Sequence, residues 1–314
     1  MRKLDIVIVT GGLGFIGKHF VRRCLSMGCF VKNIDKVSYA ADLKAKAEFE
    51  VHPNYRLFNT DVATVDYLPE CDLLVNFAAE SHVDNAITSN RRFVETNVLG
   101  TQNLLELIRQ KHPHERPLFV HISTDEVYGD IRDGKHAESD RLVPSNPYSA
   151  TKAAADMLIV SWGRTYQMPW IIVRPTNNYG EHQYPEKLIP KSVARMKRGL
   201  PATMHGDGSY VRSWLHAEDT VDALLTIVEK GERNGIYNAG SNIEIKNIEV
   251  LRAIAKCVGV PEEKAWTGAL DRSGQDVRYS LDDARLRALG WAPRRQFHEE
   301  LPRIVETTDV TRFA

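Results

Sequence analysis

The fold is decided by the stretch Thr10-Gly11-Gly12-Leu13-Gly14-Phe15-Ile16-Gly17, which joins a short apolar run to a predicted helix. The run from Leu4 to Thr10 is typical of a buried strand, and the helix is expected from Lys18 to Ser26. Glycines at this spacing permit a tight turn, let backbone N–H groups approach a pyrophosphate, and let the helix pack closely on the strand. The stretch therefore predicts a dinucleotide site at the first turn of a parallel α/β sheet.

An acidic residue ends the next predicted strand, Phe30 to Asp35. A carboxylate at this distance beyond the glycines accepts hydrogen bonds from ribose hydroxyls and repels a 2′-phosphate. Asp35 therefore favours NAD over NADP, and the adjacent Lys36 weakens that preference slightly.

Two more strands are expected before residue 81. The run from Tyr55 to Asn59 is followed by Asp61 and Val62, at the place where such folds meet adenine. The run from Asp72 to Glu80 contains Ala78 and Ala79 at its exit, where small side chains let a cofactor lie close to the backbone.

Candidate catalytic residues follow a further buried strand, Phe119 to Ile122, which runs into Thr124, Asp125 and Glu126. Ligands of open parallel sheets bind beyond the carboxyl ends of the strands, so these polar groups are expected in the crevice. A helix beginning at Pro147 then places Tyr148 and Lys152 four residues apart on one face. An ammonium beside a phenol stabilises the phenolate, so this tyrosine is a candidate base.

The rest of the chain suggests two domains. The predicted helix from Arg92 to Gln110 either packs on the sheet or joins the Tyr148 helix in a dimer face, and the two are compatible. After the strand from Trp170 to Pro175, regular strand–helix alternation loosens. We therefore expect a Rossmann-like, doubly wound parallel sheet over residues 1–175 and a smaller, mixed substrate domain over 176–314, with some chain returning to the first domain.

Composition gives no sign of nucleic acid or membrane as partner, because 41 basic residues balance 41 acidic ones and no long apolar run occurs. The four cysteines show no CxxC spacing, so neither a metal site nor a disulfide framework is expected. These features together predict a cytoplasmic protein with free thiols.

Taken together, the motifs resemble the extended short-chain dehydrogenase/reductase family, and within it the nucleotide-sugar 4,6-dehydratases, most of all those acting on dTDP-glucose. The resemblance covers nearly the whole chain. It rests on residues 10–17, Phe-Ala-Ala-Glu-Ser-His-Val-Asp (77–84), Thr-Asn-Val-Leu-Gly-Thr (96–101), Ser-Thr-Asp-Glu-Val-Tyr-Gly (123–129), Pro-Tyr-Ser-Ala-Thr-Lys (147–152), Arg-Pro-Thr-Asn-Asn-Tyr-Gly (174–180) and Tyr-Pro-Glu-Lys-Leu-Ile-Pro (184–190). The acid pair 125–126 is the discriminating feature, because the family's epimerases lack it.

This resemblance implies NAD-dependent conversion of a nucleoside-diphosphate hexose to its 4-keto-6-deoxy sugar. Tyr148, assisted by Lys152 and Thr124, would take the 4-OH proton while C4 gives hydride to NAD⁺. Glu126 would then remove the C5 proton, and Asp125 would protonate the departing 6-OH before hydride returns to C6. Adjacent carboxylates suit these opposite tasks, because each can push the other's pKa away from its own.

The resemblance also implies two sets of contacts. Cofactor contacts are expected from Gly11, Gly14, Phe15, Ile16, Gly17, Asp35, Lys36, Asp61, Val62, Ala78, Ala79, Tyr148 and Lys152. Substrate contacts are expected from Ser81, Thr124, Asn177, Lys187, Leu188, His205, Arg212 and Arg272, with the arginines suited to the diphosphate. A homodimer is the family-based expectation.

Three departures from the family pattern lie on the nucleotide side. The chain has Thr203-Met204-His205-Gly206 where dTDP enzymes usually have Pro-Ile-Tyr-Gly, and Arg272-Ser273-Gly274-Gln275-Asp276 where they have Arg-Pro-Gly-His-Asp. Ile243 replaces a typical asparagine. These differences leave the base open between thymine and uracil, with UDP-glucose and UDP-N-acetylglucosamine as alternative substrates.

Other functions of the same fold stay open at this stage. A nucleotide-sugar 4-epimerase would release the epimer without loss of water, and a 5,6-dehydratase would stop before hydride returns to C6. A dinucleotide-sensing protein on the same fold would need no catalytic set, and the intact residues Thr124, Asp125, Glu126, Tyr148 and Lys152 argue against it.

Overall fold

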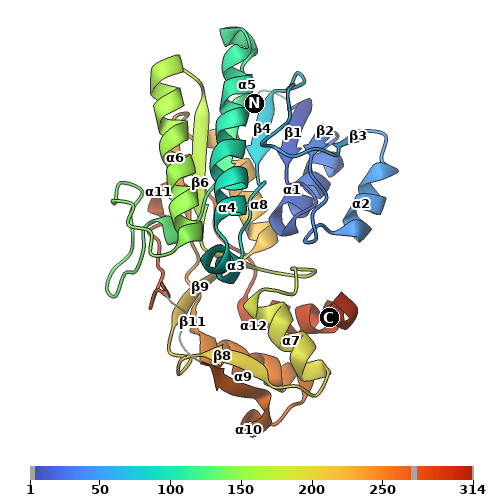
Figure 1. Ribbon diagram of the computed structural model, residues 1–314, viewed down its shortest axis with the longest axis vertical. Coiled ribbons are helices and arrows are strands. Elements are labelled where there is room, and N and C mark those ends of the chain that lie inside the picture. Colours follow the sequence, from blue (N-terminus) through green and yellow to red (C-terminus); the bar gives the residue numbers. More distant parts are fainter. Residues whose placement is uncertain (1–3, 270–273, 313–314) are drawn as a thin grey trace.

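A seven-stranded parallel sheet forms the upper part of the computed structural model, which describes residues 4–269 and 274–312 (Figure 1). Its strands, in spatial order, are β10 (Gly235–Ala239), β6 (Trp170–Pro175), β5 (Leu118–Ile122), β4 (Leu73–Asn76), β1 (Ile6–Thr10), β2 (Phe30–Ile34) and β3 (Tyr55–Phe58). The chain runs outward in one direction from β1 and in the other from β4. The carboxyl ends of β1 and β4 therefore flank a topological switch point, where ligands of such sheets bind. This arrangement confirms the predicted Rossmann-like fold.

Both faces of this sheet are buried around its central strands, where successive apolar side chains point to opposite faces. Val7 and Val9 belong to one core cluster, whereas Ile8 between them belongs to another. The first cluster also holds side chains of α1 (Phe15–Ser26), α2 (Leu43–Glu50) and α8 (Ala217–Lys230). The second holds side chains of α5 (Gly100–Gln110) and α6 (Pro147–Tyr166). Strands buried on both faces explain the continuous apolar runs of the sequence.

The helix expected from Arg92 to Gln110 contains a π-helical turn. Helix α4 (Arg91–Phe93) leads through the π turn, Val94–Leu99, into α5 without a break. Inside that turn, the buried Asn97 side chain hydrogen-bonds both the N–H and the C=O of Glu80, and also the hydroxyl of Thr151. The turn thus holds the segment after β4 in place against α6.

Smaller sheets and a second core form the lower part of the molecule (Figure 1). One sheet is mixed, because β7 (Asn177–Tyr179) pairs in parallel and β11 (Glu244–Lys246) antiparallel with β9 (Val211–His216). Strands β8 (Ala202–His205) and β12 (Trp266–Ala269) form a parallel pair. The helices of this part are α7 (Leu188–Lys197), α9 (Asn247–Val258), α10 (Glu262–Ala265) and α12 (Phe297–Thr307). A smaller mixed region was predicted, and the sheets confirm it.

Short helical segments complete the chain: α3 (Val83–Thr88), α11 (Ala284–Arg287), and 3-10 turns at Pro113–Glu115, Asp125–Val127 and Val310–Arg312. Strand β10 returns from the smaller sheets to the edge of the large one. The domain boundary at residue 175 stays a prediction. None of the helices in the described ranges has the length and apolar character needed to cross a membrane.

Candidate active site

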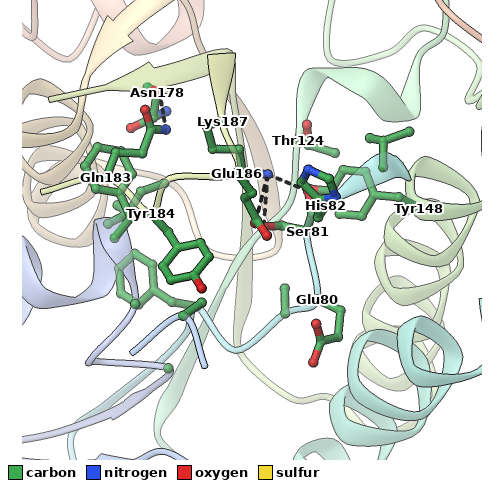
Figure 2. A pocket seen from close by; sticks show the side chains of 18 of the residues that line it. Glu80, Ser81, His82, Thr124, Tyr148, Asn178, Gln183, Tyr184, Glu186 and Lys187 are labelled. Carbon is green, nitrogen blue, oxygen red and sulfur yellow. Dashed lines mark hydrogen bonds and ion pairs between the residues drawn. The ribbon is translucent and has the colours of Figure 1, made fainter. Parts of the chain in front are cut away.

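A cleft of about 460 Å³ opens at the carboxyl edge of the large sheet and extends to the smaller sheets (Figure 2). Every predicted cofactor residue lines it, from Gly11 to Lys152. The predicted substrate and catalytic residues also line it, with two exceptions. Asp125 is buried just behind the wall, and Arg272 lies outside the described residues. The structure thus brings together residues that are far apart in the sequence.

The glycine-rich turn is as tight as the fingerprint requires. A Cβ on Gly11 would stand 2.7 Å from the backbone nitrogen of Ala78, and one on Gly17 would stand 2.3 Å from the carbonyl oxygen of Gly11. Gly11 also has a φ of +67°, which disfavours other residues. Only glycine fits these positions, and the bare backbone leaves room for a dinucleotide pyrophosphate at the start of α1.

Asp35 is oriented by two backbone N–H groups. Its Oδ2 accepts a hydrogen bond from Leu13 at 2.9 Å, and its Oδ1 accepts one from Val37 at 2.8 Å. Each oxygen keeps a free lone pair for a ribose hydroxyl. The ammonium of Lys36 lies 3.4 Å from Asp61 and 3.3 Å from Glu80, so two carboxylates neutralise a cation that would otherwise favour a 2′-phosphate. These residues fit NAD.

Asp125 and Glu126 differ in environment although they are neighbours in the sequence. The Asp125 side chain is buried, whereas Glu126 lines the cleft and accepts a hydrogen bond from Asn146 at 3.2 Å. Burial, and then the negative charge of Glu126, raises the pKa of Asp125 to about 7. A carboxyl with this pKa can donate a proton near neutral pH.

Thr176 provides independent support for a protonated Asp125. Its hydroxyl oxygen lies 2.8 Å from Asp125 Oδ2 and 3.0 Å from the carbonyl oxygen of Ser213. One hydroxyl has a single proton, and a carbonyl can only accept. Both contacts are satisfied when the Thr176 hydroxyl donates its proton to the carbonyl oxygen of Ser213 and accepts a proton from a protonated Asp125 carboxyl.

Tyr148 and Lys152 lie one turn apart on α6. Burial, and then the charge of Glu126, raises the pKa of Tyr148, while its hydrogen bond with Thr124 opposes that shift. Burial lowers the pKa of Lys152 to about 8. The Lys152 nitrogen lies 2.7 Å from the carbonyl oxygen of Ile122 and 3.0 Å from Nε2 of His121, which fix its position under the cleft.

Helix α6 begins with a capping box that also reaches the acid pair. The Asn146 side chain accepts from the N–H of Ser149 at 3.0 Å, and the Ser149 hydroxyl accepts from the N–H of Asn146 at 3.2 Å. The amide nitrogen of Asn146 is left to bind Glu126. The cap therefore orients the carboxylate as well as the helix.

The substrate side of the cleft combines cations with backbone groups. Lys187 reaches across to Ser81, whose carbonyl oxygen is 2.7 Å from the ammonium (Figure 2). Arg212 donates to the carbonyl oxygen of Asp276 at 2.8 Å, and its guanidinium lies 4.5 Å from the ring centre of Tyr279. Asn177, Leu188 and His205 also face this end of the cleft.

Sequence reasoning missed several residues that line or support the cleft: Tyr39, His121, Thr176, Tyr184, Glu186 and Tyr279. Four of these six fall in or beside the motifs quoted above, but nothing in their spacing indicated a contact. No group of three or more His, Cys, Asp or Glu side chains in the described parts of the chain is arranged to hold a metal ion.

The family model described as GDP-mannose 4,6 dehydratase matches residues 8–304. A dTDP-glucose 4,6-dehydratase of Neisseria meningitidis is 40% identical, covering 98% of this chain and 93% of that protein. A trifunctional UDP-glucose 4,6-dehydratase of Arabidopsis thaliana is 39% identical over 96% of this chain, which spans only 46% of that longer protein.

Among solved structures, the dTDP-glucose 4,6-dehydratase DesIV of Streptomyces venezuelae, with NAD and TYD bound, superposes with a TM-score of 0.91. It is 37% identical, and the match covers 96% of each chain. The family match over most of the chain and these relatives agree with the geometry of the cleft. The chain therefore belongs to the GDP-mannose 4,6-dehydratase family, a group of nucleotide-sugar dehydratases within the extended short-chain dehydrogenase/reductases.

Proposed function

We propose that the protein catalyses the NAD-dependent dehydration of a nucleoside-diphosphate hexose, a dTDP- or UDP-hexose, to its 4-keto-6-deoxy sugar. The observation that carries this proposal is the unequal acid pair beside Tyr148. One carboxyl, Asp125, is buried with a pKa raised to about 7, and its neighbour Glu126 faces the cleft. A dehydration needs one acid and one base on adjacent carbon atoms, and this pair supplies them.

The roles of the residues follow from their positions. Tyr148, supported by Lys152, removes the 4-OH proton as C4 is oxidised, and the new ketone acidifies the C5–H. Glu126 removes that C5 proton, and Asp125 protonates the 6-OH so that it leaves as water. When bound, NAD supplies the acceptor that takes hydride from C4 and returns it to C6. Glu126 then returns its proton to C5, so no net oxidation occurs.

The base of the substrate is left open between thymine and uracil, whereas the reaction is specified. Relatives of nearly equal identity are named for dTDP-glucose and for UDP-glucose. The test is incubation of the purified protein with dTDP-glucose, UDP-glucose and UDP-N-acetylglucosamine separately, followed by mass spectrometry. Loss of one water from one of them is expected and identifies the base. Release of an epimer of unchanged mass, or no change in any of the three, would contradict the proposal.

Two variants separate the proposed roles. Tyr148→Phe should abolish C4 oxidation, lowering turnover by about a hundredfold or more, because no base accepts the 4-OH proton. Glu126→Gln should still permit C4 oxidation but prevent deuterium from D₂O from entering C5. Deuterium incorporation at the wild-type rate in Glu126→Gln would show that another group is the C5 base.

The oligomeric state and the location are also proposals. Val94 and Leu99 of the α4–α5 stretch and Met157 of α6 are exposed apolar side chains, which support a helical homodimer interface. Light scattering after gel filtration should give twice the monomer mass, and a monomer would contradict the dimer. The cytoplasmic location and the division into residues 1–175 and 176–314 also stay predictions.

A further inference from the structure

The segment 274–279 packs between the start of β9 and the start of α6. On the β9 side, the N–H of Val211 donates to the carbonyl oxygen of Val277 at 2.9 Å. On the α6 side, a Cβ on Gly274 would stand 2.6 Å from the carbonyl oxygen of Ser145, so the two backbones are in close contact there. The segment therefore joins two elements that both carry residues of the cleft.

Asp276 is the buried acid of this segment, and each of its carboxylate oxygens has its own partner. Oδ1 accepts a hydrogen bond from the hydroxyl of Ser145 at 2.5 Å, and Oδ2 accepts one from the hydroxyl of Tyr279 at 2.6 Å. The backbone carbonyl of Asp276 accepts from Arg212 at 2.8 Å. Burial of a carboxylate is costly unless its oxygens are hydrogen-bonded. The two hydroxyls offset this cost and hold Asp276 at a defined position between Arg212 and Ser145.

One end of this chain of contacts lies on the nucleotide side of the cleft. Arg212 and Tyr279 both line the cleft, and the Arg212 guanidinium lies 4.5 Å from the centre of the Tyr279 ring. A guanidinium suits a diphosphate, and Arg212 is a predicted substrate contact. A diphosphate bound to Arg212 would restrict the guanidinium, and its hydrogen bond would in turn restrict Asp276.

The other end lies beside the acid pair. Ser145 directly precedes Asn146, whose amide nitrogen donates to Glu126 at 3.2 Å. The bond from Ser145 to Asp276 holds the backbone from which the Asn146 side chain extends. The capping box already orients that side chain through Ser149. The bond to Asp276 adds a second restraint, which depends on the segment 274–279.

We propose that Asp276 is a positioning residue that links nucleotide binding at Arg212 to the orientation of Glu126. The inference rests on the proposed function, in which Glu126 is the C5 base. A nucleotide on Arg212 holds Asp276 and Ser145 in place, and Asn146 then holds the Glu126 carboxylate for attack on the C5–H. Binding energy from the nucleotide, which does not react, is thereby used at the carbon that does.

The first test compares Ser145→Ala with Ser145→Thr, because threonine keeps the hydroxyl. In Ser145→Ala, C4 oxidation should proceed at nearly the wild-type rate, whereas deuterium entry at C5 should slow by about tenfold. NADH formed by C4 oxidation should therefore accumulate on the enzyme, and its absorbance in a single turnover measures this. Ser145→Thr should restore the C5 rate and remove the accumulation.

The second test follows the link by hydrogen exchange, without catalysis. Saturating UDP or dTDP alone should slow exchange of the backbone amides of residues 145–150 by about threefold or more in the wild type and in Ser145→Thr. It should not do so in Ser145→Ala. Tyr279→Phe keeps the ring beside Arg212 but loses the hydroxyl that binds Asp276, so it should also weaken this protection.

Two results would overturn the proposal. One is equal slowing of C4 oxidation and of deuterium entry in Ser145→Ala, which would leave Asp276 a purely structural role. The other is protection of residues 145–150 by the nucleotide to the wild-type extent in Ser145→Ala. Absence of water loss in the wild type, with the nucleotide still protecting residues 145–150, would instead contradict the proposed function, whereas the link from Arg212 to Asn146 would stand.

Discussion

At the scale of single residues, the buried acid Asp125 links function to stability. The usual pKa of an aspartate is 3.8, and in the folded protein it is raised to about 7. Across this window the folded chain holds a proton that the unfolded chain has released. The free energy of unfolding therefore falls as pH rises from about 4 to about 7. The proposed catalytic acid costs the protein stability at the pH where it works.

Replacing Asp125 with asparagine tests this cost. The amide is isosteric and cannot ionise, and its N–H can bind Thr176 as the protonated carboxyl does. Asp125→Asn should unfold at a higher temperature than the wild type at about pH 8, by about 1–3 kcal/mol in free energy, and the gain should vanish near pH 4. Thermal unfolding of both proteins at about pH 8 and about pH 4 measures this gain in stability. The exposed Asp66→Asn is the matched control, and a gain independent of pH would contradict the argument.

At the scale of elements, the first turn of α6 supports both the helix and Glu126. Asn146 and Ser149 each contribute one side-chain hydrogen bond to the capping box, but only Asn146 contacts Glu126. Asn146→Ala and Ser149→Ala should each cost about 1 kcal/mol of stability. Only Asn146→Ala should also slow deuterium entry at C5, because only this change removes a hydrogen bond to the Glu126 carboxylate. Thermal melts and the exchange rate separate the two effects, and equal exchange rates would show that the cap does not orient Glu126.

The elements of the first 175 residues could be predicted because the strands are short, mostly apolar runs that end in, or are followed by, glycine or a polar residue. The expected strand from Leu4 to Thr10 begins at Ile6, and the expected helix start at Pro147 is confirmed. The π turn, Val94–Leu99, could not be predicted, because its apolar residues fit an α-helix equally well. The pairing of β8 with β12 joins segments with no common sequence signal.

Placement of the site could be predicted for the same reason: the residues follow strand ends, and parallel strand ends meet at one edge. Contacts that depend on tertiary packing could not. His121 alternates with Val120 along β5, and nothing in that pattern indicates that its ring meets the Lys152 ammonium. Thr176 was quoted in a motif without a role, and its contact with Asp125 appears only in the folded chain.

At the scale of the whole molecule, the segment 181–187 joins the two sides of the cleft. The ammonium of Lys18, on α1, donates to the carbonyl oxygen of His182 at 2.9 Å. Tyr39 donates to Glu186 at 3.2 Å, and its ring packs edge-on against Tyr184. These contacts lie beside the glycine-rich turn and Asp35. The segment is therefore expected to help retain NAD, which must stay bound while the sugar passes through its oxidised form.

Lys18 is central to the contact between α1 and the segment 181–187. Its side chain is buried, and its ammonium lies 2.8 Å from Asp42. Lys18→Met leaves the Asp42 carboxylate buried without its cation and should cost about 3 kcal/mol, whereas Lys18→Met/Asp42→Asn removes both charges and should recover most of that loss. Both variants lose the hold on His182, so both should release NAD faster than the wild type. Thermal melts and the NAD retained after gel filtration measure the two effects separately. If the double variant regains stability but still loses NAD, the hydrogen bond from Lys18 to His182 helps to retain NAD. If the double variant retains NAD fully, the segment 181–187 does not help to retain it.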